Sequence, residues 1–206
     1  MIIEQYGIRL KRVEFNDIEL IRRWRNDPTI RKTMEYKKRI SEEMQKKWFQ
    51  SINTPFNYYF MIQVDDEPIG VLNCKNINLE EGYGEGGIFV WKHNAGEYIP
   101  VFASLCFLNV VFTELDIFNK SFIKVHKENK KAIVFNRSLG YVLVPGQENR
   151  DFQYYVLTRE DYNRKSQKWI QLAEKLSGDL EKPKFWGVPG PLNLDVINEK
   201  LSFQAS

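Results

Sequence analysis

Residues 122–141 read FIKVHKENKKAIVFNRSLGY, and this stretch decides the fold of the chain. Its first residues, 122–125, carry apolar side chains in the pattern of a short buried strand. The pair at 128–129 offers a helix start, and Gly140 offers a helix stop. Apolar side chains recur between them at helical spacing, at Ala132, Ile133, Phe135 and Leu139. The stretch therefore predicts a strand, a polar turn and a helix that ends at a glycine.

This order resembles that of one enzyme superfamily, the acyl-CoA-dependent N-acetyltransferases known as GNAT. In that family the same place carries a strand, an asparagine, an Ala-Ile pair and a Leu-Gly-Phe/Tyr run that opens the next strand. The matching residues in this chain are Asn129, Ala132, Ile133, Leu139, Gly140 and Tyr141. One position differs, because most family members have a tyrosine that protonates the departing thiolate where this chain has Asn136.

The rest of the chain follows the family's order of elements. The patterns predict helices after Asn16, after Ser41 and over 99–115, and strands at 7–13, 58–64, 69–74, 86–91, 141–144 and 152–157. The resemblance covers roughly residues 8–157 and implies an α/β fold, with a mixed, mostly antiparallel sheet of roughly six to seven strands flanked by helices. We expect residues 1–158 to form this domain. Residues 159–206 are expected to pack on it as a helix, over 160–176, and an irregular arm.

Composition fits one domain with a mixed surface. The 206 residues are 43% hydrophobic and 28% charged, and their net charge of +3 is too weak for a nucleic-acid-binding surface. Cys74 and Cys106 lie in apolar segments without partners at metal-ligand spacing, so we expect buried reduced thiols and no metal site. No run reaches the ~20 apolar residues of a membrane span, and the N-terminus lacks a secretory pattern. The expectation is a cytoplasmic protein without a membrane partner, as a monomer or homodimer.

The resemblance also implies a cofactor site for acetyl-CoA. In the family the pantetheine lies beside the strand that corresponds to Phe89 and Val90, and the following loop and helix start bind the pyrophosphate. The family loop reads Gln/Arg-x-x-Gly-x-Gly/Ala, and the corresponding residues here are His93, Asn94, Ala95, Gly96, Glu97 and Tyr98. Only Gly96 matches clearly, since Tyr98 replaces a small residue and Glu97 adds a like charge. An ordinary loop before a helix that starts with Pro100 is the alternative.

Four residues of the predicted helix after residue 129 are assigned to the cofactor side. Asn129 has two readings, a helix cap or a cofactor contact like its family counterpart. Ala132 and Phe135 are assigned as cofactor contacts on the same resemblance. Asn136 is assigned as a catalytic residue and is expected to face the cleft, where its amide could hydrogen-bond the cofactor sulfur without acting as an acid at neutral pH.

Acyl transfer to an amine needs a base and a group that stabilises the oxyanion. Glu85, just before the third hairpin strand, is the candidate base, and a solvated glutamate is its alternative reading. Backbone N–H groups near Phe89 and Val90 are the candidate oxyanion donors. His126 is a second candidate base, although alternation with Val125 favours a surface position.

The acceptor clue is the run at residues 24–28, Trp-Arg-Asn-Asp-Pro. It resembles the first helix of GNAT enzymes that acetylate nucleotide-linked amino sugars, of the pseudaminic acid pathway type, and of ribosomal-protein N-terminal acetyltransferases. Arg25 and Arg31 could grip a diphosphate, and Trp24 or Met34 could cover a base or sugar. The alternative is a helix end with a core tryptophan and solvated arginines.

The function predicted from the sequence is transfer of acetyl from acetyl-CoA to a primary amine, on a nucleotide-linked amino sugar. Two alternatives stay open at this point. One is a GNAT-shaped module that binds a CoA ester without turnover. The other is a protein N-terminal acetyltransferase.

Overall fold

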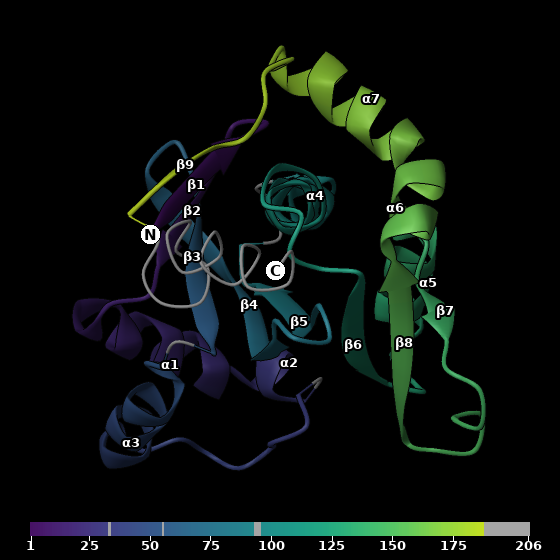
Figure 1. Cartoon of the computed structure of the whole chain (residues 1–206). Helices are drawn as coiled ribbons and strands as arrows, with labels where there is room; N and C mark the ends of the chain where they lie inside the picture. The colour runs from purple at the N-terminus through teal and green to yellow at the C-terminus, as the bar shows by residue number, and fades with distance from the viewer. Residues whose placement is uncertain (33, 55, 93–95, 188–206) are drawn as a thin grey trace.

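The computed structural model describes residues 1–32, 34–54, 56–92 and 96–187, which form one open sheet of nine strands with helices on both faces (Figure 1). The strand order is β7-β8-β6-β5-β4-β3-β2-β1-β9. Neighbouring strands are antiparallel except β5 and β6, which are parallel. The strands are β1 (Ile2–Gln5), β2 (Ile8–Arg12), β3 (Tyr58–Val64), β4 (Glu67–Asn78), β5 (Tyr83–Val90), β6 (Lys120–His126), β7 (Val142–Leu143), β8 (Phe152–Thr158) and β9 (Lys184–Trp186).

The helices divide between the two faces. Those in chain order are η1 (Phe15–Asp17), α1 (Ile18–Asn26), α2 (Pro28–Arg31), α3 (Glu42–Ile52), α4 (Ile99–Asn109), the π-helical η3 (Val110–Glu114), α5 (Lys130–Leu139), α6 (Arg159–Lys165) and α7 (Gln167–Ser177). One face packs against α1, α2 and α3, and the other packs against α4 (Figure 1). No helix in the described part of the chain has the length and apolar character needed to cross a bilayer.

Alternation along the strands builds the two cores. In β3, Tyr58, Phe60 and Ile62 belong to the large core under α4. Tyr59 and Met61, between them, belong to the smaller core under α1 and α3. The predicted α/β fold, a mostly antiparallel sheet flanked by helices, is therefore confirmed.

The sheet has more strands than predicted. The two strands that the sequence analysis did not predict, β1 and β9, both lie at the same edge, beyond β2. β1, at the N-terminus, pairs with β2, and β9 pairs with β1 in antiparallel register. The expectation of an irregular arm is thus wrong for residues 184–186. Val188 and the residues after it lie outside the described part of the chain.

The predicted helix over 160–176 is two helices, α6 and α7, which meet at Ser166. Ser166 is fully buried and its hydroxyl donates to the carbonyl of Leu139 at 3.0 Å. The sequence predicts an apolar side of this helix that includes Tyr162 and Leu176. Tyr162 is buried, whereas Leu176 is 55% exposed. The tyrosine hydroxyl donates to the Asn109 side chain, whose amide nitrogen donates to Gln5 at 2.8 Å. This buried network links α6 to α4 and β1.

Two predicted features of the N-terminal helices differ from the structure. Asn16 does not cap a helix, because Glu14 and Asp17 form the capping box of η1 and α1 follows directly. Ser41 does cap α3, accepting from the amide of Met44 at 3.2 Å. Met44 itself is 40% exposed, so the expected buried stripe is wrong at that position.

The predicted long helix over 99–115 also divides. α4 ends at Asn109, and the turn that follows is π-helical. Pro100 lies in the first turn of α4, as predicted. Cys74 and Cys106 are both free and buried, and burial raises the pKa of each thiol.

Candidate active site

The site is built around an opening in the sheet between β5 and β6. Their parallel pairing begins at Tyr83 and Lys120 and ends at Gly86 and Ile123. Beyond that point β5 pairs only with β4, and β6 pairs only with β8. The last residues of β5 therefore present a free edge to the opening.

Alternation shows which backbone groups face this edge. The amide of Trp91 donates to Ile69 on the β4 side at 2.9 Å, and the carbonyl of Gly82 accepts from Asn119 at 2.6 Å on the β6 side. Even-numbered residues of β5 therefore direct their N–H and C=O groups toward β6. Ile88 and Val90 carry the free groups at the opening, whereas the backbone of Phe89 faces β4.

Helix α4 is the next helix along the chain after this strand, and it begins at Ile99. Gly96 has φ +123°, a conformation open to glycine, which explains why the glycine is needed in this turn. Pro100 has no N–H, and the amide of Val101 finds no acceptor among the described residues. The start of α4 therefore offers unpaired donors and the positive end of a helix dipole to an anion.

The side chain of Tyr98 does not lie over this helix start. Its ring stacks on Phe102, one turn into α4, at 6.2 Å between centroids, and approaches Trp169 of α7 at 6.4 Å. Tyr98 is 44% exposed and Glu97 is exposed as well. His93, Asn94 and Ala95 lie outside the described residues.

Helix α5 borders the other side of the opening. Asn129 is its N-cap, and its side-chain oxygen accepts from the amide of Ala132 at 3.2 Å. Asn136 is buried, and its amide nitrogen donates to the carbonyl of Ala132 at 2.7 Å. Ala132 and Phe135 are half-buried. The capping reading of Asn129 is thus present in the structure, and one side-chain donor of Asn136 is occupied by its own helix.

On the face under α1 and α3, Glu85 is held by two donors. Its carboxylate lies 2.9 Å from the Nζ of Lys75 and accepts from the Nδ2 of Asn76 at 3.2 Å. The Glu85 side chain is only 13% exposed. A glutamate fixed by side chains and largely removed from water is a better candidate base than the solvated alternative.

Tyr59 and Arg25 lie on the same face. Burial raises the pKa of the Tyr59 phenol, the charge of Glu85 raises it further, and the charge of Arg25 lowers it. Burial also lowers the pKa of Arg25, with only the Tyr59 phenol opposing it. The Arg25 guanidinium lies 5.9 Å from the Phe89 ring, and its buried Nη1 has no hydrogen-bond partner among the described residues.

Trp24 packs into the core beside these residues. Its ring stacks on Trp91 at 5.8 Å, and Met34 lies against the same cluster. Arg31 is half-buried at the end of α2. The structure thus brings Arg25, Trp24 and Phe89 together, and the stack fits the packing reading of the tryptophan.

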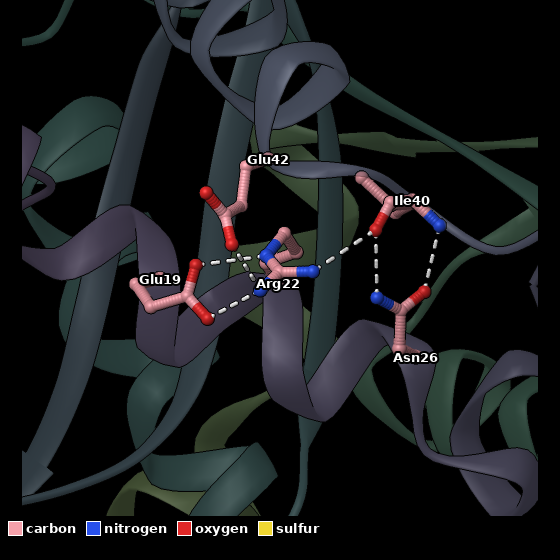
Figure 2. Close-up of polar contacts among 5 residues, drawn as sticks. All are labelled: Glu19, Arg22, Asn26, Ile40 and Glu42. Carbon is pink, nitrogen blue, oxygen red and sulfur yellow. Dashed lines mark hydrogen bonds and ion pairs between the residues drawn. The ribbon is translucent and has the colours of Figure 1, made fainter.

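The segment that joins α2 to α3 is fixed at both ends. Figure 2 shows Asn26 of α1 paired with the backbone N–H and C=O of Ile40, and Arg22 between Glu19 and Glu42. At the other end, Glu35 pairs with Lys124 of β6 at 2.9 Å. The two ends of this segment therefore contact α1 and β6, on either side of the opening.

His126 is half-buried rather than on the surface. Its ring lies edge-on to Phe152 at 4.9 Å, and its Nδ1 accepts from the amide of Glu128 at 3.2 Å. These contacts fix the turn before α5. They give the histidine a structural role that its sequence context did not predict.

Two residues of this face were missed by the sequence analysis, Tyr59 and Asn73. Both belong to predicted strands, and their parity with Met61 and Val71 assigns them to the face under α1 and α3. The strand alternation that gives this parity was the available signal.

Two surface hollows, of about 320 and 230 Å³, lie away from the opening, on the β1–β3 side and beside α1 and α3.

A family model for the GNAT acetyltransferase domain matches residues 10–171. The chain belongs to the GNAT acetyltransferase family. As a GNAT protein it is an acyl-CoA-dependent N-acyltransferase, so the reading as a module without turnover is set aside. No curated protein sequence matches the chain.

Solved GNAT structures share the fold. FdhC, described as a nucleotide-linked sugar GNAT, is 22% identical with a TM-score of 0.69, over 83% of this chain and 97% of that one. A Vibrio cholerae spermidine N-acetyltransferase, solved with CoA and spermine, is 19% identical with a TM-score of 0.67, over 77% and 99%. The ribosomal L7/L12 α-N-protein acetyltransferase RimL, solved with CoA, is 15% identical with a TM-score of 0.66, over 77% and 98%. At these identities the GNAT fold is shared, and the acceptor of this GNAT protein is a separate question.

Proposed function

We propose that this protein transfers acetyl from acetyl-CoA to the primary amine of a nucleotide-linked amino sugar. The observation that carries the acceptor class is Arg25, a partly buried guanidinium that has, among the residues the structure describes, no carboxylate beside it and no partner for its Nη1. A buried cation without an anionic partner is costly unless a ligand supplies one. Phosphate and carboxylate groups are the anions that a guanidinium binds through two parallel hydrogen bonds, and the diphosphate of a nucleotide-linked sugar is the anion proposed here.

The surroundings of Arg25 support an anionic acceptor. Arg31 is half-buried nearby in the sequence, and the segment before Ile40 carries the exposed cations Lys37, Lys38 and Arg39. Spermidine, a cation, would meet like charges here. The nucleotide-linked sugar activity named for FdhC is consistent with the same class of acceptor.

The residues around the opening fit acetyl-CoA, which supplies the acetyl group as a thioester when it is bound. The start of α4 would hold the pyrophosphate, and the free edge of β5 with Ala132 and Phe135 would hold the pantetheine. The N–H of Val90 is the proposed donor to the oxygen on which charge develops. Glu85 takes the proton of the attacking amine, directly or through water.

Thiol release from acetyl-CoA tests the proposal with four amines: a nucleotide-linked amino sugar, the same amino sugar without its nucleotide, spermidine and a peptide with a free N-terminus. The nucleotide-linked sugar is expected to be the preferred acceptor, and removal of the nucleotide should raise KM at least tenfold. Preference for the peptide would support an N-terminal acetyltransferase instead. No thiol release with any amine would refute the enzyme assignment.

Arg25→Met should raise the KM of the nucleotide-linked sugar at least tenfold and leave the KM of acetyl-CoA unchanged. Arg23→Met is the matched control, because Arg23 is exposed on the same helix and lies beside Trp24. Equal effects of the two substitutions would contradict the anion-binding role. Gly96→Trp should weaken CoA binding in calorimetry, since the substitution fills the turn before α4.

A further inference from the structure

Three residues form a row across the sheet on the face under α1 and α3. Tyr59 of β3 pairs with Asn73 of β4, and Asn73 pairs with Gly87 of β5. Gly87 is the first residue of β5 beyond its last pair with β6, at Gly86. The row therefore ends at the opening in the sheet.

The glycine at position 87 is explained by the asparagine beside it. A Cβ on Gly87 would lie 2.8 Å from the Oδ1 of Asn73, too close for an undisturbed contact, and 3.4 Å from its Nδ2. The backbone itself does not call for glycine, because Gly87 is not among the residues with positive φ. The missing side chain thus makes room for the Asn73 carboxamide, which lies over β5 at the opening.

The Asn73 carboxamide has no hydrogen-bond partner among the residues that the structure describes, although it is half-buried. A carboxamide carries one oxygen acceptor and two N–H donors. Its polar atoms keep some contact with solvent, so the carboxamide is accessible to a ligand as well as unpaired within the described part of the chain. A polar ligand at the opening would satisfy it.

Glu85 lies on the same face of β5, two residues before Gly87 and hence about 7 Å along the strand. The phenol of Tyr59 lies at the other end of the row. Burial raises its pKa most, and the charge of Glu85 raises the pKa further. The carboxamide is thus flanked by the candidate base and by a neutral hydroxyl.

We propose that Asn73 binds the acceptor amine at the opening, with its Oδ1 accepting an N–H of the nucleophile. During transfer the N–C bond forms and the C–S bond of the thioester breaks, so that CoA leaves as the thiolate. The amine proton goes to Glu85 or water. The inference rests on acyl transfer to an amine, and it holds for any of the acceptor classes tested above.

The experiment is a double-mutant cycle of Asn73→Ala, Gly87→Ala and the double variant, assayed by thiol release with the amine that gives the fastest turnover in the panel. Asn73→Ala should lower kcat/KM for the amine 10- to 100-fold and change the KM of acetyl-CoA less than twofold. Gly87→Ala should lower it similarly, because its methyl group displaces the carboxamide. The double variant should be no worse than Asn73→Ala alone.

Each outcome decides the assignment. Retention of half the wild-type kcat/KM by Asn73→Ala would overturn it. If Gly87→Ala lowered kcat/KM as much in the Asn73→Ala background as in the wild type, the assignment would also be overturned. The glycine would then be needed for contact with the ligand and not for the position of the Asn73 carboxamide. Thermal unfolding checks folding, and Asn73→Ser, which removes the carboxamide but supplies a small polar side chain, replaces Asn73→Ala if that variant unfolds. Turnover of another amine with none of the nucleotide-linked sugar would refute the proposed acceptor only, whereas no turnover at all would overturn both.

Discussion

The Nζ of Lys75 lies 2.9 Å from the carboxylate of Glu85, across the ladder that joins β4 to β5. The pair sits one row from the end of the β5–β6 pairing, on the face where the acceptor is expected. One carboxylate oxygen of Glu85 contacts Lys75 and the other accepts from the Nδ2 of Asn76, so a negative charge is held at a defined position. This geometry makes Glu85 the residue whose removal is most informative.

Glu85→Gln is expected to lower kcat about 100-fold or more, because the amide keeps the shape of the side chain but cannot take a proton. The measurement is thiol release at saturating amine, across pH. Lys75→Met is the control, since it removes the ion pair and keeps the carboxylate, and it should cost less than tenfold. A Glu85→Gln variant with more than a third of wild-type kcat would assign the base to another group.

Asn136→Ala should slow turnover no more than about fivefold. The amide is a poor acid, and one of its donors is already bonded to the carbonyl of Ala132 at 2.7 Å. Loss of that hydrogen bond is expected to lower the free energy of unfolding by about 1 kcal/mol. Steady-state kinetics and urea unfolding give the two values. A 100-fold loss of kcat with normal stability would mean that Asn136 takes part in the chemistry.

Two glycines of β5 offer a matched pair for stability. A Cβ on Gly84 would lie 2.5 Å from the Sγ of Cys74 and 2.9 Å from the Phe118 ring, whereas one on Gly86 meets nothing closer than 3.7 Å. Gly84→Ala should therefore destabilise the protein by about 1–3 kcal/mol through overpacking. Gly86→Ala should lie within about 1 kcal/mol of the wild type in urea unfolding. Equal changes in the free energy of unfolding for the two variants would show that the core under α4 shifts to accept the Gly84 methyl group, which would contradict the prediction.

The elements predicted well are those whose signals are local. The start at Asn129 and the stop at Gly140 are both present, because a cap hydrogen bond and a left-handed glycine are properties of a few neighbouring residues. The strands of the β3–β4 hairpin were predicted for the same reason, from β-forming residues on both sides of a turn. The Asn16 cap failed because a second capping box, at Glu14 and Asp17, competes within the same few residues.

The site itself could be predicted only in part, because it depends on pairing between distant segments. The opening exists where the β5–β6 pairing ends at Gly86, and no local pattern marks that residue as the last pair. The strand β9 is likewise determined by the edge that β1 offers to it. Asn73 and Tyr59 were missed because the pattern of a strand predicts the face on which a side chain lies but not the residue that it meets on the neighbouring strand. The row from Tyr59 through Asn73 to Gly87 depends on that pairing.

Alkaline stability should depend on Cys74. Burial raises the pKa of this thiol above its unfolded value of about 8.5, so the unfolded chain releases the proton first as pH rises. The contribution is fully present below about pH 8.5 and is lost as pH increases toward the folded pKa, at about 1.4 kcal/mol per pH unit. Urea unfolding between pH 9.5 and 10.5 should therefore show a shallower decline for Cys74→Ala than for the wild type. Val71→Ala, a buried control without a thiol, should lose stability equally at both pH values, and parallel slopes in all three proteins would contradict the coupling.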